Sequence, residues 1–409
     1  MAQQTQQSAS SLADKMEALA KQLVSSASAL RANPTAKQDY LDIIESADAL
    51  LIEIKDPMGK AMDQMISLTT FAAMRLFIKW RLFDEIPASE PISYRELASR
   101  IGAEMGLIAR FGSALVAAGV LQQKDKGTVV HTTQSRSLIS GSPLNAFICL
   151  GFDVHIKTSS RLPDYFDKFG LSEPIGRENT PVGFAAGNAS LTIWEHLERS
   201  SEKKKMFMLA MQAMADKHGM TGNYSFEWVV NKVAESPDRP LIVDVGGNNG
   251  HALESIVEAT GLPMDRCVLE DLEPVLEVVK SEANGPIKQA QLVALDFHAE
   301  QPVKGAVLYY IRRCLHDYGD ADCIKILKQI SSAMASDSRI LIVETVVEDP
   351  PSALSIANDI LMLMIGGKER TLEEFTSIME AADLEVEKLW RFRGTDYAII
   401  EGRKIGGVE

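Results

Sequence analysis

The alternation of apolar runs with helical segments after residue 240 constrains the fold of this chain more than any other feature of its sequence. Apolar runs typical of strands lie at 241–245, 266–270, 291–295, 305–310 and 338–344, and a final pair lies at 384–393 and 396–402. Because strands that alternate with helices form parallel sheets, we predict an α/β fold with a doubly wound sheet. Ligands of such sheets bind at the carboxyl ends of the strands.

The first of these runs ends in a glycine-rich turn, which predicts a binding site. In LIVDVGGNNGHALESI the run stops at Gly246-Gly247, two asparagines lead to Gly250, and helix-forming residues follow. A turn between a strand and a helix directs backbone N–H groups at a ligand. The dinucleotide fingerprint needs glycines at i, i+2 and i+5, and neither glycine of the pair starts such a series. Gly367-Lys368 is followed by Glu369 and forms no Walker A loop, so neither NAD nor ATP is expected.

Acidic side chains follow the next two predicted strands. Glu270 and Asp271 close the second run, and Asp296 and Phe297 follow the third. At that edge of a parallel sheet, a carboxylate can accept hydrogen bonds from both hydroxyls of a ribose. The three strand ends together therefore favour a ligand that contains a nucleoside.

The chain before residue 150 is rich in helices instead. Helical periodicity is found at 12–31, 59–85 and 107–120. Ser93 and Glu96 form a capping box ahead of a further helix, and a two-stranded wing with Lys126-Gly127 at its tip follows the third segment. This order predicts a winged helix.

The composition argues against nucleic acid as the partner of this winged helix. Its second helix carries one cation, Arg110, and the whole chain has a net charge of −14, whereas phosphate binding needs a basic face. The helices at 12–31 and 59–85 carry more apolar surface than a small winged helix can bury. We therefore predict a homodimer built on this region and no binding of nucleic acid.

Three regions are expected along the chain. They are a helical, winged-helix dimerisation domain at 1–150, a helical linker at 151–235 that lines the substrate pocket, and a catalytic domain at 236–409. No stretch approaches 18 apolar residues, and the first residues lack the basic and apolar segments of a secretory signal. A cytoplasmic protein that does not contact membranes is the expectation.

The motifs together carry a resemblance to a known family. DVGGNNG, EDLEPV, LDF, YYIRRCLHDYGDADCIKIL, ILIVETVV and GGKERTLEEF follow one another as in the plant and fungal type O-methyltransferases that use S-adenosylmethionine. The resemblance spans essentially the whole chain. It implies an N-terminal winged-helix dimerisation domain and a Rossmann-like class I methyltransferase domain with a mostly parallel, seven-stranded sheet.

The resemblance also implies roles for individual residues. It places the cofactor against Asp244, with Gly246 and Gly250 at its methionine part and Asp271 at its ribose. It places Asp296 and Phe297 at the adenine and Arg312 at a polar group of the cofactor. His316 is then similar to the family's catalytic base, and Glu344 and Glu369 to the carboxylates beside it. The family usually has glycine where this chain has Asn248.

His316 suits the chemistry of such a site. A sulfonium methyl group is already activated, so the protein has to align the acceptor and remove a proton from a phenol of pKa near 10. Histidine can do this near neutral pH, and Glu344 could hold its tautomer. Alternatively, His316 caps the helix that starts near Asp320, and the two glutamates are solvated. The other six histidines show no metal-ligand spacing, so no metal is predicted.

Two enzymatic functions remain open. The first is methyl transfer to a hydroxyl of a small aromatic, phenolic or polyketide-like metabolite. The second is dehydration or a pericyclic reaction without methyl transfer, which some fungal proteins of this resemblance catalyse. His316, Glu344 and Glu369 favour the first, whereas Asn248 leaves room for the second. A transcriptional regulator is disfavoured by the acidic charge and the apolar second helix.

Overall fold

The computed structural model describes residues 2–33, 37–174, 176–215, 221–222, 224–282, 284–392 and 394–407. Contacts between residues divide the chain into two compact units, Met1–Ile148 and Cys149–Glu409. Among the described residues, no helix has the length and apolar character that crossing a membrane requires.

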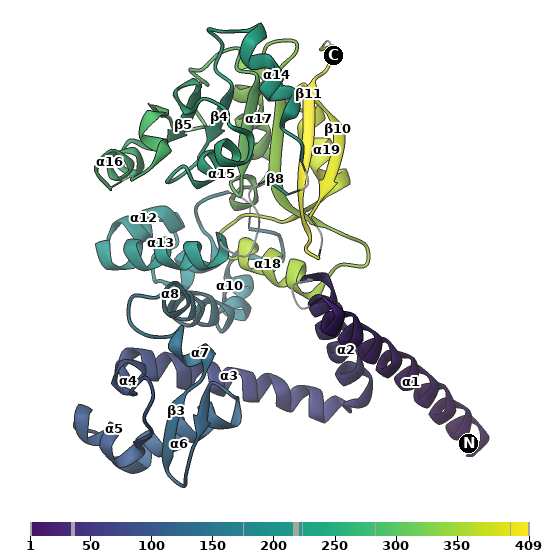
Figure 1. The fold of residues 1–409 in the computed structure, drawn as a ribbon, viewed down its shortest axis with the longest axis vertical. Helices are drawn as coiled ribbons and strands as arrows, with labels where there is room; N and C mark the ends of the chain where they lie inside the picture. Colours follow the sequence, from purple (N-terminus) through teal and green to yellow (C-terminus); the bar gives the residue numbers. More distant parts are fainter. Residues whose placement is uncertain are drawn as a thin grey trace. The chain divides into compact units, whose positions relative to one another are not determined.

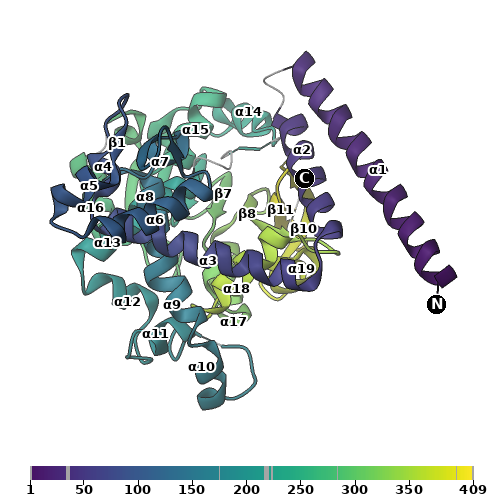
Figure 2. The ribbon, with the colours of Figure 1, turned by 90° about the horizontal axis from the view of Figure 1, so that it is seen from below.

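The first unit is a winged helix preceded by long helices, as predicted. Its helices are α1 (Ala2–Ala32), α2 (Lys37–Ile54), α3 (Pro57–Lys79), α4 (Leu82–Glu85), α5 (Tyr94–Ile101), α6 (Met105–Ala117) and α7 (Thr133–Arg136). The wing consists of β2 (Leu121–Gln123) and β3 (Thr128–His131), and β1 (Ile92–Ser93) adds a third strand. Ser93 accepts a hydrogen bond from the Glu96 N–H and caps α5. Helices α1 and α2 lie side by side (Figure 2).

One helix of this unit was predicted wrongly. The segment 59–85 was expected to be continuous, but α3 ends at Lys79 and α4 begins at Leu82. Arg81 between them has a left-handed backbone (φ 55°), which a helix cannot continue through. The apolar residues Phe77 and Leu82 are fully buried on either side of this break. The break lets the end of α3 and the short α4 both pack into the core of the unit.

Apolar side chains of the long helices remain exposed. Ile52 at the end of α2 is 60% exposed, and Met58, Met65 and Ile66 of α3 are between 54% and 69% exposed. Large apolar side chains in contiguous helices are a common feature of protein interfaces. The homodimer stays a prediction, and these residues are the surface on which it depends.

The second unit contains the predicted doubly wound sheet (Figure 1). Its strands are β4 (Ile242–Val245), β5 (Cys267–Asp271), β6 (Gln291–Ala294), β7 (Leu308–Arg312), β8 (Arg339–Val347), β10 (Leu384–Arg391) and β11 (Tyr397–Lys404). They lie in the order β10-β11-β8-β7-β4-β5-β6, and a two-residue strand, β9 (Arg370–Thr371), pairs with β8. The five strands from β8 to β6 run parallel, and β11 is antiparallel to both of its neighbours. All seven predicted strands are therefore present.

Helices cover both faces of this sheet. They are α14 (Glu227–Glu235), α15 (His251–Thr260), α16 (Glu273–Glu282), α17 (Asp320–Ala333) and α19 (Leu372–Glu380). Helix α18 (Ala353–Leu363) follows β8 and contributes no residue to either core cluster. Val243 and Val245 belong to the core cluster that includes α17 and α19, whereas Ile242 belongs to the cluster that includes α14, α15 and α16. Because both faces of the sheet are covered, every residue of β4 is buried, including Asp244, its one charged residue.

The segment before β4 consists of short helices. They are α8 (Pro143–Leu150), a π-helix (Gly151–Ile156), α9 (Lys157–Ser159), α10 (Leu162–Phe169), α11 (Pro181–Ala185), α12 (Ile193–Glu198) and α13 (Ser201–Ala215). The loop before α11 packs on the chain after α18. The Val182 N–H donates to the Met364 carbonyl (3.0 Å), and a Cβ on Gly366 would lie 2.2 Å from the Gly176 carbonyl oxygen.

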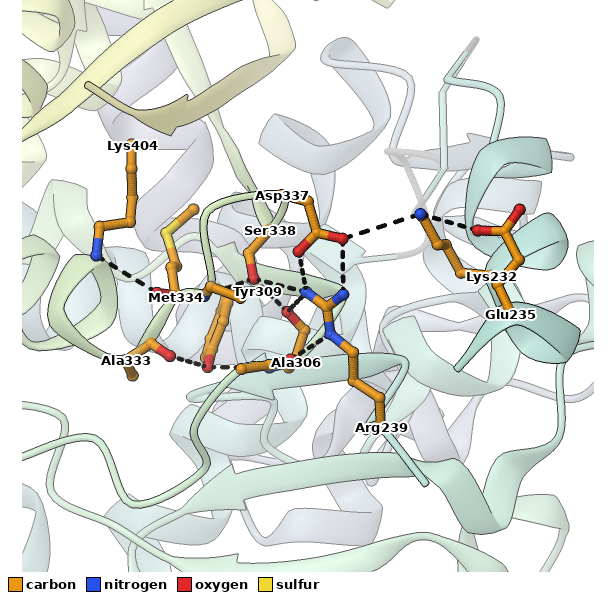
Figure 3. A network of polar contacts seen from close by, with 12 residues as sticks. Lys232, Glu235, Arg239, Ala306, Tyr309, Ala333, Met334, Asp337, Ser338 and Lys404 are labelled. Carbon is orange, nitrogen blue, oxygen red and sulfur yellow. Dashed lines mark hydrogen bonds and ion pairs between the residues drawn. The ribbon is translucent and has the colours of Figure 1, made fainter. Parts of the chain in front are cut away.

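The amino-terminal edge of the sheet is held by a network around Arg239 (Figure 3). Its guanidinium donates to both carboxylate oxygens of Asp337 (2.8 Å each) and to the hydroxyl of Ser338 (3.0 Å). It also donates to the carbonyls of Gly305 and Ala306, which precede β7. These bonds tie together the chain segments that lead into β4, β7 and β8.

Candidate active site

The glycine-rich turn after β4 lies at the carboxyl edge of the sheet. Gly246 has a left-handed backbone (φ 70°), and a Cβ there would lie 2.9 Å from the Cys314 Sγ and 3.3 Å from the Phe297 ring. Only glycine therefore fits. The N–H groups of Gly246 and Gly247 donate to the Glu270 carbonyl (2.8 and 3.1 Å). The prediction that these N–H groups point at a ligand is wrong, because they tie the turn to β5.

Asn248, where the related family usually has glycine, also has a left-handed backbone (φ 52°). Asparagine tolerates this conformation better than most residues with a side chain. Its N–H donates to the Asp271 Oδ2 (2.8 Å), and the Leu272 N–H donates to Oδ1 (2.8 Å). Both oxygens of Asp271 keep a further lone pair each, so this carboxylate is held in place and can still accept from a ribose.

Asp296 and Phe297 follow β6, as predicted. The Asp296 Oδ1 accepts a hydrogen bond from the His298 N–H (3.0 Å) and lies 2.9 Å from the His298 Nδ1. Phe297 packs edge-on against Tyr318, with ring centroids 5.8 Å apart, and it lies beside Gly246. The structure thus brings Phe297 to the glycine-rich turn, while Asp296 is paired with its neighbour.

Asp244 and Arg312 place unpaired polar atoms inside the site. Asp244 lies within β4 and not at its end, and burial raises its pKa to about 7 although Arg312 opposes the shift. The Asp244 Oδ2 and the Arg312 Nε and Nη2 are buried, and none of these atoms has a hydrogen-bond partner among the described residues. Because buried polar groups are normally paired, such atoms indicate a bound ligand.

His316 lies in a single 3₁₀ turn after β7 (Leu315–Asp317) and is buried. Its Nδ1 lies 3.0 Å from the Glu369 Oε1 and 3.7 Å from the Glu344 Oε2. The other oxygen of Glu344 accepts the N–H groups of Cys314 and Leu315 (2.9 Å each). The structure therefore brings together the three residues predicted to form the catalytic group.

The carboxylates around His316 set its proton affinity. Burial by itself lowers the pKa of His316, but Glu344, Asp317 and Glu369 outweigh it and raise the pKa to about 9. Burial raises the pKa of Glu344 and of Asp317, and the charge of His316 opposes both shifts. The imidazole is therefore a strong proton acceptor in a pocket of negative charge.

The structural alternatives for these residues are wrong. The residue that caps α17 is Gly319, so His316 caps no helix. Glu344 is fully buried and Glu369 is 4% exposed, so neither is a solvated acid. The ligand atoms of His316, Glu344 and Glu369 lie within 4.8 Å of one another, a set that could also hold a metal ion. Local spacing in the sequence does not indicate this set, because His316 and Glu369 are 53 positions apart.

Three further residues of the site escaped the sequence analysis. The Asp317 Oδ1 lies 3.6 Å from the His316 Nε2. The charge of Arg313 opposes the rise in the pKa of Asp317 and of Glu344. Arg370 is fully buried beneath the His316 turn. The two arginines gave no signal in the sequence, because their partners lie far away along the chain.

Comparisons with known proteins identify the family of the chain. An O-methyltransferase domain family matches residues 173–385, and an O-methyltransferase dimerisation domain matches residues 62–141. The methyltransferase cfoD of Aspergillus candidus is 36% identical over 399 residues, which cover 95% of this chain and 98% of that protein. The methyltransferase fsa4 of Fusarium sp. (strain FN080326) is 34% identical over 336 residues, which cover 82% of this chain and 93% of that protein.

Solved structures share the fold. OxaC in complex with SAH and oxaline has a TM-score of 0.83 at 23% identity, covering 96% of this chain and 100% of that one. A pericyclic reaction enzyme has a TM-score of 0.79 at 21% identity, covering 98% and 100%. Since the family match spans more than half of the chain and the relatives above 30% identity cover most of it, this protein belongs to the O-methyltransferase family, whose members use S-adenosylmethionine.

Proposed function

We propose that this protein transfers a methyl group from S-adenosylmethionine to a hydroxyl of a small aromatic or polyketide-like metabolite, with His316 as general base. The observation that carries this proposal is the buried His316 with two carboxylates on its Nδ1 side. This group lies next to the glycine-rich turn, because the Sγ of Cys314, two residues before His316, is 3.8 Å from the Gly246 carbonyl oxygen.

The residues of the carboxyl edge fit this cofactor. Asp271 would accept from the ribose, and the side of the turn left open by Gly246 would face the methionine part. The unpaired Arg312 donors suit a carboxylate, and Phe297 beside the turn suits an adenine. When bound, S-adenosylmethionine supplies a methyl group that is already activated for transfer.

The protein's own part in the reaction is to move and hold a proton. His316 would take the proton of the acceptor hydroxyl on its Nε2, since its Nδ1 faces Glu369. Glu369 and Glu344 would then stabilise the imidazolium, because two buried carboxylates lie within 4 Å of the ring. The pKa of His316, raised to about 9, is close to the pKa of a phenol, which is near 10. Proton transfer from a phenol to a histidine with its ordinary pKa would be less favourable.

The test is incubation with methyl-labelled S-adenosylmethionine and a panel of phenols and enolic 1,3-diketones. We expect a product heavier by one labelled methyl group and equimolar S-adenosylhomocysteine. A chelator should leave the rate unchanged, because the proposed chemistry needs no metal. Loss of activity in the chelator would instead assign a metal ion to His316, Glu344 and Glu369.

The second function, a reaction without methyl transfer, has one observation in its favour. A histidine of pKa about 9 is protonated at neutral pH, so it can also donate a proton to a substrate. Retention of S-adenosylmethionine with a rearranged or dehydrated product and no methyl gain would select this function. The same mass measurement therefore separates the two.

We also propose that the protein is a homodimer through its first unit. The family's dimerisation domain covers residues 62–141, and the exposed apolar side chains of α2 and α3 offer a surface to bury. Sedimentation at micromolar concentration should give twice the 44.8 kDa mass of one chain. Sedimentation as a single chain would contradict the proposal.

A further inference from the structure

A fully buried arginine, Arg370, lies beneath the turn that carries His316. Each of its five N–H groups has a partner. Nε and Nη2 donate to the Asp320 Oδ1 (2.9 and 2.7 Å), and Nη1 donates to the Lys368 carbonyl (3.1 Å). Nη1 also donates to the Leu315 carbonyl (3.2 Å), and Nη2 to the Tyr318 carbonyl (2.8 Å). Because a buried charge is costly unless it is fully hydrogen-bonded, these five bonds hold the guanidinium in one fixed position.

The turn itself has little support of its own. Its backbone makes two long hydrogen bonds, from the Asp317 N–H to the Cys314 carbonyl (3.3 Å) and from the Tyr318 N–H to the Leu315 carbonyl (3.2 Å). A single 3₁₀ turn of this kind is weak by itself. Two of the carbonyls that Arg370 binds, those of Leu315 and Tyr318, lie on either side of His316 in the sequence. The guanidinium therefore links the two ends of the turn that carries the base.

The residues just before Arg370 hold the same turn. The Lys368 N–H donates to the His316 carbonyl (2.8 Å), and the Glu369 side chain faces the His316 ring. Gly367 packs so closely that a Cβ would lie 2.1 Å from the His316 carbonyl oxygen. Four consecutive residues therefore lie against the turn, and Arg370 is the member that reaches both of its ends.

We propose that Arg370 is a positioning residue, which fixes the His316 ring between Glu369 and Glu344 for proton transfer. This inference rests on the proposed role of His316 as a base. An arginine can do this because its planar fork presents five donors, whereas lysine presents three donors from one point. A misplacement of about 1 Å in an active site can lower a rate about 10²-fold.

The titration of His316 reports its position. The charged groups that face it are Glu344 from β8, Glu369 from the segment before β9, and Asp317 from the turn itself, while Arg313 acts on two of these acids. Behind Glu369 lies Asp359 of α18, which accepts the Glu369 N–H (2.9 Å). If the turn loosens, the ring moves away from these carboxylates, and the pKa of His316 falls toward its ordinary 6.5.

The test compares Arg370→Lys with Arg239→Lys, an equally bonded arginine at the opposite edge of the sheet. The pKa of His316 is measured by NMR of protein with labelled histidine, with His316→Gln to assign the signal. We expect Arg370→Lys to move this pKa toward 6.5 and to lower kcat about 10- to 100-fold. Binding of S-adenosylhomocysteine should change less than about threefold, because no cofactor residue is altered. Arg239→Lys should leave the pKa and kcat unchanged.

A second pair of variants changes exposed side chains, so that the test does not depend on whether Arg370→Lys folds. Asp320 anchors Arg370 and its side chain is 55% exposed, whereas Asp322 in the same first turn of α17 pairs with Lys325. Asp320→Ala should shift the pKa in the same direction by less, and Asp322→Ala should not shift it.

If the Arg370 and Asp320 variants melt at lower temperature but keep the pKa of His316 and kcat of wild type, Arg370 is structural and the proposal is wrong. The NMR titration needs no acceptor. The positioning role therefore stands or falls separately from the proposed methyl transfer.

Discussion

Arginine and acidic side chains lie at both edges of the sheet, but they make different interactions there. At the amino-terminal edge, the side chains of Arg239, Asp337 and Ser338 keep no buried polar atom without a hydrogen bond, and only the Nε of Arg266, which donates to the Arg239 carbonyl through another nitrogen, lacks one. At the carboxyl edge, Asp244, Glu344 and Glu369 each keep a buried oxygen that makes no hydrogen bond, and Arg312 keeps two such nitrogens. Complete pairing stabilises the fold, whereas incomplete pairing costs stability and leaves groups ready for a ligand. We infer that the contrast between these two clusters reflects a structural role for Arg239 and a ligand-binding role for the carboxyl edge.

The largest expected effect follows from removing the base at the carboxyl edge. His316→Ala should lower kcat about 10²- to 10⁴-fold, the usual contribution of a positioned acid–base group, with little change in cofactor affinity. Steady-state rates and calorimetry with S-adenosylhomocysteine measure the two quantities. His131→Ala is a suitable control, since that ring lies in the first unit and pairs with Ser135. A His316 variant within a few-fold of wild type would show that the residue only packs.

The next effect tests the cofactor side of the same edge. Asp271→Ala should weaken S-adenosylhomocysteine about 10- to 100-fold, because hydrogen bonds to a charged group contribute about 1.5–3 kcal/mol. Calorimetry gives the affinity directly. Asp265→Ala, a change before β5, serves as the control. Equal affinity for S-adenosylhomocysteine in wild type and in Asp271→Ala would show that Asp271 does not bind the ribose.

The amino-terminal edge should respond in stability and not in turnover. Arg239→Met removes the donor of the Gly305 carbonyl and the two hydrogen bonds that Asp337 accepts, which should cost about 1–3 kcal/mol of unfolding free energy. Chemical denaturation measures this loss, and kcat should stay within about twofold of wild type. A large fall in kcat with unchanged stability would break the distinction between the two edges.

The smallest effect concerns the turn residue that departs from the family. Because Asn248 already has a left-handed backbone, Asn248→Gly should keep the path of the turn and change cofactor affinity less than about threefold. Asn248→Ala should be worse by about 1 kcal/mol, since alanine does not favour this conformation. Tighter binding by more than tenfold in Asn248→Gly would mean that the asparagine side chain obstructs the cofactor.

The sequence was sufficient for the sheet and for its ligand edge. Each strand is a short apolar run, and the period of two or of 3.6 residues is a local property that a single chain displays. The position of His316 followed from the same rule, because residues after a parallel strand meet at one edge. The break at Arg81 could not be predicted, since it depends on how Phe77 and Leu82 pack in the folded unit.

The partners of the site residues were harder to predict than the residues themselves. Arg370 is 55 positions from Leu315, and no periodicity links a buried arginine to carbonyls so distant. The N–H groups of Gly246 and Gly247 were expected to face a ligand, but the Glu270 carbonyl on the next strand accepts them. Hydrogen-bond pairing across strands depends on the three-dimensional register, which the composition of a turn does not contain.

The pH dependence of methyl transfer, measured in wild type and in Glu344→Gln with the same acceptor, tests the proposed role of His316 most directly. His316 must lose its proton to act as a base, so the rate should rise with pH through an apparent pKa near 9. The charge of Glu344 is the largest single interaction that raises the pKa of His316, so Glu344→Gln should move the profile toward 6.5. The ionisation of the acceptor is the same in both measurements and cancels in the comparison. Two superimposable profiles would contradict the account, because His316 would then not be the group that takes the proton.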